Sequence, residues 1–275
     1  MSVDPVQEKF FNVRAAIPDA VDVLTTWRQR SDAYKLRSPR AQLDLAYGES
    51  AGQTLDYYPA NETGGPLMMF IHGGYWQTLD KADSGFIAGA MVDAGVNVAV
   101  VNYDLCPHVN LSTIVEQMQS ALQWLRSHAE DLGADPTRLF VSGHSAGGHL
   151  TGMLMATAAP NVIRGGLAVS GLFDLRALVN TTINDKVGLT METAFDLSPM
   201  LMKPVDHAPV ILAVGGKESQ GFHDQSIRFG VQWRNAGARA ELVSIAGCDH
   251  LRAIEALTEP DSNLFARTMC MISGD

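Results

Sequence analysis

Short hydrophobic runs alternate with longer stretches of helical spacing along most of the chain. The short runs are rich in Val, Ile, Leu and aromatic residues, which is typical of β-strands. Eight of them predict strands, at residues 41–47, 54–58, 66–71, 96–102, 139–142, 166–170, 209–214 and 241–245. Strands that alternate with helices are typical of a mostly parallel sheet with helices on both faces. The pattern therefore predicts an α/β fold built on an eight-stranded sheet.

Three segments with helical spacing each end at a glycine, which is a common helix stop. They are residues 81–94, 113–132 and 225–236. In the second of these, Thr113 and Glu116 have the spacing of a capping box, which predicts that this helix begins at Thr113.

Residues 175–204 interrupt the alternation, because they mix polar residues, Gly and Met between the sixth and seventh strands. We interpret this segment as a small lid, although its apolar residues also suit ordinary packing against the sheet. No linker rich in Pro, Gly or Ser divides the chain, and 275 residues suit one large core. We therefore predict a single domain over residues 1–275, in which residues 1–40 have no recognisable functional motif.

Composition narrows the partners that the chain can have. Hydrophobic residues make up 46% and the net charge is −10, so the chain is typical of a folded protein that does not bind nucleic acid or anionic membranes. The first twenty residues lack a secretory pattern, and no apolar run approaches the roughly 20 residues that span a bilayer. We expect a cytoplasmic protein without a membrane partner. Three widely separated cysteines predict buried free thiols.

The segment Gly143-His144-Ser145-Ala146-Gly147 carries the strongest chemical signal. It follows the strand at 139–142 and opens a helix-prone stretch at 146–158, which is the context of a nucleophile elbow. At such a turn the serine adopts a strained backbone conformation, and its neighbours two residues away must be small. The alternative is a glycine-rich turn in which the serine has no catalytic role. Other segments of the chain are needed to distinguish the two.

A second glycine-rich segment, His72-Gly73-Gly74-Tyr75-Trp76, follows the strand at 66–71. In a sheet with a nucleophile elbow, this loop supplies half of the oxyanion hole. We expect the backbone N–H of Gly73 or Gly74 to join that of Ala146 at the carbonyl oxygen of the substrate. His72 is interpreted as a residue that braces the loop.

A serine nucleophile needs a base, and the base needs an orienting carboxylate. His250 follows the last strand and is the histidine that this architecture places near the elbow. Glu218 is the first carboxylate after the seventh strand, and Asp224 and Asp174 are alternatives to it. The chain order Ser145, Glu218, His250 is the order of the α/β-hydrolase fold. No histidine has a partner at metal-ligand spacing, so we expect no metal and no cofactor.

Four segments together resemble the arylformamidase (kynurenine formamidase) branch of the esterase/lipase superfamily. They are His72-Gly73-Gly74-Tyr75-Trp76-Gln77, Tyr103-Asp104-Leu105-Cys106-Pro107, Gly143-His144-Ser145-Ala146-Gly147-Gly148-His149-Leu150 and Gly216-Lys217-Glu218-Ser219. The resemblance spans most of residues 66–250 and implies an α/β-hydrolase fold. That branch hydrolyses N-formylkynurenine to kynurenine and formate, and related members are carboxylesterases. Glu218 stands where an aspartate often serves, and Gly148 where some relatives have alanine.

The resemblance leaves three functions open. The first is cleavage of a small acyl amide such as an aryl formamide, with Tyr75, Trp76 and His144 as candidate substrate contacts. For Tyr75 and Trp76 the alternative role is loop packing, and for His144 it is a local hydrogen bond. The second function is a short-chain carboxylesterase, and the third is a binding protein that has lost catalysis. The expected partner is a small-molecule substrate, and a homodimer is a further possible assembly.

Overall fold

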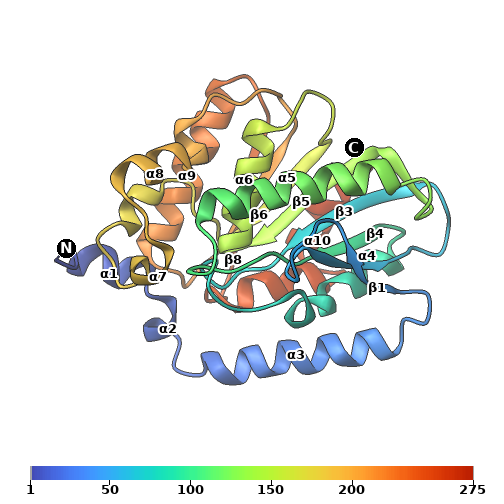
Figure 1. The fold of residues 1–275 in the computed structure, drawn as a ribbon, viewed down its shortest axis with the longest axis horizontal. Coiled ribbons are helices and arrows are strands. Elements are labelled where there is room, and N and C mark those ends of the chain that lie inside the picture. The colour runs from blue at the N-terminus through green and yellow to red at the C-terminus, as the bar shows by residue number, and fades with distance from the viewer. Residues whose placement is uncertain (1, 275) are drawn as a thin grey trace.

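The computed structural model describes residues 2–274, and their eight strands form one sheet (Figure 1). The strand order is β1-β2-β4-β3-β5-β6-β7-β8. β2 pairs antiparallel with both β1 and β4, and every other pairing is parallel. The strands are β1 (Gln42–Ala46), β2 (Thr54–Tyr58), β3 (Gly65–Ile71), β4 (Asn97–Val101), β5 (Ala134–His144), β6 (Gly165–Val169), β7 (Val210–Gly215) and β8 (Ala240–Ile245). The eight-stranded, mostly parallel sheet is therefore confirmed, with β5 longer than predicted.

Helices cover both faces of the sheet. α5 and α6 pack together against β5, and α9 packs against β7 and β8, while α4, η5 and α10 lie on the other face. The helical elements are α1 (Pro5–Phe11), α2 (Val13–Ala16), α3 (Ala20–Leu36), η1 (Lys81–Asp83), η2 (Gly85–Ile87), α4 (Ala88–Asp93), α5 (Leu111–His128), α6 (Ala146–Thr157), η3 (Leu175–Leu178), α7 (Asn184–Val187), α8 (Met191–Asp196), η4 (Pro199–Leu201), α9 (Gln220–Asn235), η5 (Arg252–Thr258) and α10 (Asn263–Ser273).

The central strands are buried on both faces, as parallel strands covered by helices must be. All residues of β4, β6 and β7 are buried, and so are six of the seven residues of β3. This explains why their sequences are continuous hydrophobic runs and do not alternate. The carboxyl ends of β3 and β5 lie side by side, because Ile71 pairs with Gly143 in the parallel register. The loops that follow these two strands therefore meet at one edge of the sheet.

The predicted helix at 81–94 is wrong in its first half, which forms η1 and η2 before the short helix α4 begins. The Lys81 side chain is buried, and its ammonium lies 2.7 Å from Oδ1 of Asp56. The chain bends here and places Lys81 inside the protein. Further along, a Cβ on Gly85 would lie 3.1 Å from the hydroxyl of Tyr58. Ion pairing and close packing against the sheet thus override the regular helical spacing.

Two helices begin earlier than predicted. α5 begins at Leu111, because the Asn110 side chain accepts a hydrogen bond from the backbone N–H of Thr113 at 2.8 Å. Thr113 therefore lies inside the helix and is not its cap. α9 begins at Gln220, so Asp224 lies within the helix.

The N-terminal segment forms three helices that pack onto the sheet domain at the carboxyl ends of the strands. Phe11 at the end of α1 is buried and contacts Phe222 of α9 edge to face at 5.4 Å between ring centroids. Trp27 of α3 is also buried, and α3 packs along η1 and η2. In Figure 1 the N-terminal helices α1 and α2 lie beside α7, although about 170 residues separate them in sequence.

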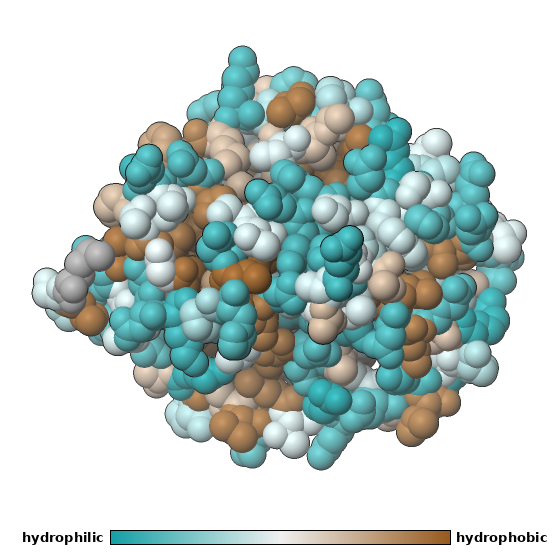
Figure 2. Space-filling view, in the orientation of Figure 1, coloured by the Kyte–Doolittle hydropathy of each residue, from teal (hydrophilic) through white to brown (hydrophobic). Residues whose placement is uncertain are grey.

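The surface is mixed, with hydrophobic residues in several separate groups among hydrophilic ones (Figure 2). No helix within residues 2–274 is long and apolar enough to cross a membrane. All three cysteines are free. Cys106 is buried, Cys248 is half-buried, and Cys270 is exposed on α10. The prediction of buried thiols therefore holds for one of the three.

Candidate active site

Ser145 occupies a sharp turn between β5 and α6. Its φ of 57° and ψ of −116° place it in a strained region for a residue with a side chain. A Cβ on Gly143 would lie 2.3 Å from the carbonyl oxygen of Gly147, and a Cβ on Gly147 would lie 2.0 Å from that of Ile71. Only glycine fits at either position, which is the steric reason for the pattern around Ser145. The turn has the geometry of a nucleophile elbow.

Gly148 has its own packing requirement. A Cβ there would lie 2.8 Å from the Cα of Gly171, at the start of the loop that follows β6. Helix α6 therefore approaches this loop too closely for alanine at position 148.

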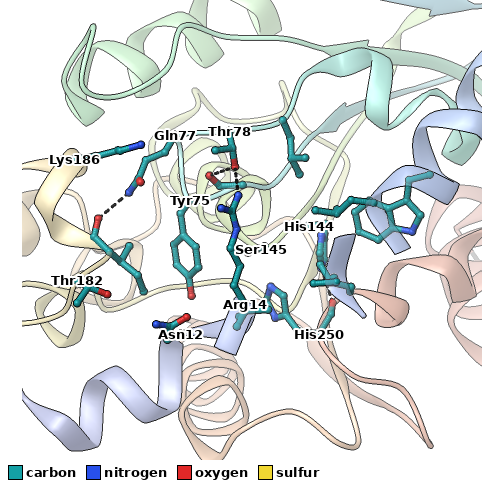
Figure 3. A pocket seen from close by; sticks show the side chains of 18 residues that line it. Asn12, Arg14, Tyr75, Gln77, Thr78, His144, Ser145, Thr182, Lys186 and His250 are labelled. Carbon is teal, nitrogen blue, oxygen red and sulfur yellow. Dashed lines mark hydrogen bonds between the residues drawn. The ribbon is translucent and has the colours of Figure 1, made fainter. Parts of the chain in front are cut away.

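His250 and Glu218 meet at the same edge of the sheet. His250 follows β8, Glu218 follows β7, and the Nδ1 of His250 lies 2.7 Å from Oε2 of Glu218. His250 and Ser145 both line one cavity, as Figure 3 shows. The structure therefore brings together the three residues that sequence reasoning selected.

The Glu218 carboxylate is enclosed by hydrogen-bond donors. Its Oε1 accepts hydrogen bonds from the hydroxyl of Ser170 at 2.5 Å and from the backbone N–H of Gly215 at 2.6 Å. Burial raises the pKa of this carboxyl, but the neighbouring His250 and these hydrogen bonds together hold it below its usual value. Glu218 is thus an anion suited to fix the proton of His250 on Nδ1.

The two alternative carboxylates lie elsewhere. Asp174 caps η3, and its Oδ2 accepts a hydrogen bond from Arg176 at 2.7 Å. Asp224 accepts a hydrogen bond from Gln220, one turn earlier on the exposed side of α9. Neither contacts His250.

The two segments expected to form the oxyanion hole lie next to Ser145. A Cβ on Gly73 would lie 3.2 Å from the Cβ of Ser145, so this loop passes directly over the serine. Gly74 has a φ of 97°, and a Cβ there would lie 2.0 Å from the carbonyl oxygen of Thr78, which explains the second glycine. Ala146 is the first residue of α6, where backbone N–H groups have no partner within the helix.

The three residues expected to contact the substrate differ in their positions relative to the cavity. Tyr75 lines the cavity and its hydroxyl donates a hydrogen bond to the carbonyl of Phe11. Trp76 is fully buried, does not line the cavity and packs edge to face against His149. Trp76 therefore has the packing role that the sequence left open, and a role in substrate contact is not supported.

His144 makes the local hydrogen bond that was its alternative role, and its contact with substrate stays a prediction. It lines the cavity, and its Nε2 lies 2.8 Å from the backbone oxygen of His250. A carbonyl only accepts, so Nε2 of His144 is the protonated nitrogen. Burial and the neighbouring His250 lower the pKa of His144 to about 3, so it remains neutral. His144 thus anchors the loop that presents His250. The remaining loop histidine, His72, is buried and stacks on Tyr103, as expected of a bracing residue.

The cavity has a volume of about 290 Å³, and sequence reasoning missed the part of its wall that the N-terminal segment provides. The N-terminal segment contributes Asn12, Val13, Arg14, Ala20, Leu24 and Trp27. Residues 175–204 contribute Thr182, Ile183 and Lys186. The N-terminal wall residues lie in or beside α2 and α3, far from the elbow in sequence, so no local pattern marked them.

Comparison with known proteins identifies the family. The family model described as BD-FAE matches residues 55–165. Kynurenine formamidase of Salmo salar is 32% identical over 81% of this chain and 79% of the relative, and that of Drosophila melanogaster is 32% identical over 82% and 80%. The chain belongs to the kynurenine formamidase family.

Solved structures share the fold of this chain. A candidate thioesterase from Silicibacter sp. has a TM-score of 0.84 and 30% identity, covering 94% of this chain and 97% of that one. Esterase 2 of Thermogutta terrifontis has a TM-score of 0.69 at 22% identity, covering 86% and 96%, and shows the shared fold. The protein is an α/β-hydrolase enzyme that acts on small molecules.

Proposed function

We propose that this enzyme hydrolyses an aryl formamide such as N-formylkynurenine, through a formyl-enzyme on Ser145. The observation that carries the proposal is the placement of Ser145 and His250 on one small cavity, with His250 held by the buried Glu218. The likeness to kynurenine formamidases along four fifths of the chain supports the choice of substrate. The cavity volume of about 290 Å³ lies at the lower end for ligand sites, as a small substrate requires.

In the proposed reaction, Ser145 Oγ attacks the formyl carbon while Nε2 of His250 takes the hydroxyl proton. The negative charge that develops on the formyl oxygen is met by backbone N–H groups of Gly73 or Gly74 and Ala146. His250 then returns the proton to the leaving amine as the C–N bond breaks. Water, deprotonated by His250, attacks the formyl ester, and formate and free Ser145 result. Glu218 keeps Nε2 of His250 unprotonated for the first step.

We further propose that residues 175–204 act as a lid within a single domain. Thr182, Ile183 and Lys186 border the cavity, and the Gln77 side chain donates a hydrogen bond to the Ile183 carbonyl at 2.7 Å. This bond joins the lid to the glycine-rich loop that follows β3. The lid is thus placed to shape the pocket for the leaving group.

A short-chain carboxylesterase is the second candidate, because the same residues also accept an ester carbonyl. The likeness to a candidate thioesterase over nearly the whole chain favours it. A binding protein without catalysis is the third, and the completeness of Ser145, Glu218 and His250 argues against it.

The deciding experiment compares kcat/KM for N-formylkynurenine with that for p-nitrophenyl acetate and butyrate. The proposal expects efficient deformylation, and an enzyme that cleaves the esters but not the formamide would replace it with the esterase. Labelling of Ser145 by a fluorophosphonate distinguishes both enzymes from a binding protein, because only an activated serine reacts quickly. The homodimer, the cytoplasmic location and the absence of nucleic-acid and membrane partners stay predictions, and light scattering of the purified protein tests the first.

A further inference from the structure

The wall of the cavity has an unusual charge for this protein. The chain has 30 acidic and 20 basic residues, yet Arg14 and Lys186 line the cavity and no Asp or Glu of the described chain does. Glu218 lies behind His250 with its side chain fully buried. The site therefore presents positive charge to a substrate in a protein that is otherwise strongly negative.

Both cations lack an acidic partner. Within residues 2–274, neither Arg14 nor Lys186 forms an ion pair, whereas the nearby Arg252 pairs with both Asp19 and Asp249. The guanidinium of Arg14 donates one hydrogen bond, to the hydroxyl of Thr78 at 3.3 Å. The Lys186 ammonium makes no hydrogen bond in that part of the chain. Most donors of both groups are thus available to a ligand.

Glu8, an acidic residue that contacts Thr182 beside the cavity, does not compensate for these charges. Glu8 of α1 accepts hydrogen bonds from the backbone and hydroxyl of Thr182 at 2.8 and 2.6 Å, and from the Asn12 amide at 2.7 Å. It serves to tie the N-terminal segment to the lid. Burial raises the pKa of Glu8, but these hydrogen bonds hold it below the usual value. Glu8 therefore stays an anion whose oxygens are already hydrogen-bonded to Thr182 and Asn12.

The two cations come from parts of the wall that the sheet does not provide, Arg14 from α2 and Lys186 from α7. Figure 3 shows Arg14 rising from the N-terminal segment across the cavity toward Thr78, and Lys186 beside the opposite wall near Gln77. Ser145, by contrast, belongs to the sheet edge. A substrate with its carbonyl at Ser145 therefore extends its leaving group toward the walls that carry the charges.

We propose that Arg14 and Lys186 bind a carboxylate on the leaving group and so select aryl formamides that bear an acidic side chain. This inference rests on the proposed function, because it assigns the leaving-group end of that same site. Arg14 presents a planar fork suited to a carboxylate, and Thr78 holds one of its nitrogens in place. Lys186 adds a second positive charge without a fixed geometry.

The test compares two substrates that share the aryl formamide and the ketone and differ in the amino-acid group, which carries the carboxylate together with an amine. N-formylkynurenine carries an amino-acid group, and o-formamidoacetophenone keeps the aryl formamide and the ketone without it. For R14Q, the ratio of kcat/KM for the acid to that for the neutral formamide should fall about tenfold, which is the size of one charge-assisted hydrogen bond. The loss should be in KM, and adding K186Q should enlarge it.

Three controls separate specific binding from general effects. R14K keeps the charge and should recover part of the ratio. R126Q removes an exposed cation on α5, which does not line the cavity, and should leave the ratio unchanged. Added salt should raise the KM of the wild type for the acid and should have less effect on the double variant R14Q/K186Q.

The proposal would be overturned if R14Q lost kcat/KM equally on both substrates, or lost none on either. If the wild type cleaves neither formamide, the proposed function fails by itself. The cations are then tested with two aryl acetates, one with a carboxylate and one with a carboxamide on the phenol. A lower ratio for these esters in R14Q supports carboxylate binding, and an unchanged ratio refutes it.

Discussion

The substitution E218Q tests the proposed role of Glu218 with almost no change in shape. The Oε1 position accepts a hydrogen bond from the backbone N–H of Gly215, which can only donate. The amide oxygen of the new side chain must therefore stay at that position, and its NH₂ group must turn toward Nδ1 of His250. Two donors then face each other over the 2.7 Å contact unless His250 moves its proton to Nε2.

A histidine protonated on Nε2 cannot accept the proton of Ser145. We therefore expect kcat to fall by about 10⁴-fold, the size of the loss when the orienting carboxylate of such a triad becomes an amide. The fold should persist, because the hydrogen bonds with Ser170 and Gly215 can remain. A loss of about 1 kcal/mol in the free energy of unfolding would lower the melting temperature by only about 2–4 °C.

The assay is stopped-flow or steady-state deformylation with saturating substrate, together with nitrogen NMR of the histidine rings to read the tautomer. D174N is the matched control, since Asp174 pairs with Arg176 and does not contact His250. Retention of more than about a tenth of kcat by E218Q would refute the reasoning about the tautomer, since the expected loss is far larger. An inactive D174N beside an active E218Q would move the orienting role to Asp174.

Three further outcomes follow from the geometry. S145A should lose about 10⁴-fold or more in kcat and all fluorophosphonate labelling, while its circular dichroism stays unchanged; turnover at the wild-type rate would exclude Ser145. G148A should lose about 1–3 kcal/mol of stability in urea unfolding, because its Cβ would lie 2.8 Å from the Cα of Gly171; an unchanged midpoint would mean that the helix moves freely. His144 and His149 have pKa values of about 3 and about 4, against 6.5 when unfolded, so the unfolded state binds protons that the folded state does not. The free energy of unfolding should therefore be highest above pH 6.5 and should fall as the pH drops below it, less steeply in H149Q than in the wild type. Equal slopes of this free energy against pH in the two proteins would contradict a neutral buried His149.

The sheet and the loops at its carboxyl edge could be predicted from the sequence because their signals are local. Glycines at 143, 147, 73 and 74 are required by contacts within a few ångströms of Ser145. Strand runs are continuous because both faces are buried. Helix starts were less predictable, since Asn110 caps α5 from outside the periodic stretch and α9 begins after Ser219 without a side-chain cap hydrogen bond.

The N-terminal part of the cavity wall could not be predicted, because it depends on contacts between distant parts of the chain. Arg14 and Leu24 reach the site only after α1 packs on α9 and α3 packs on η1 and η2. Trp76 has a positive φ, which a residue with a side chain rarely adopts. No pattern in the neighbouring residues indicates such a conformation.

The origin of the cavity wall in the first helices has a practical consequence for protein engineering. The strained serine, its base and the sheet that supports them are encoded after residue 41, whereas six of the wall residues come from positions 12–27. Substrate preference and chemical machinery are therefore separable in the gene. A library that varies only this N-terminal stretch, or exchanges it with that of a related enzyme, changes which leaving groups are accepted while the reacting groups stay as they are.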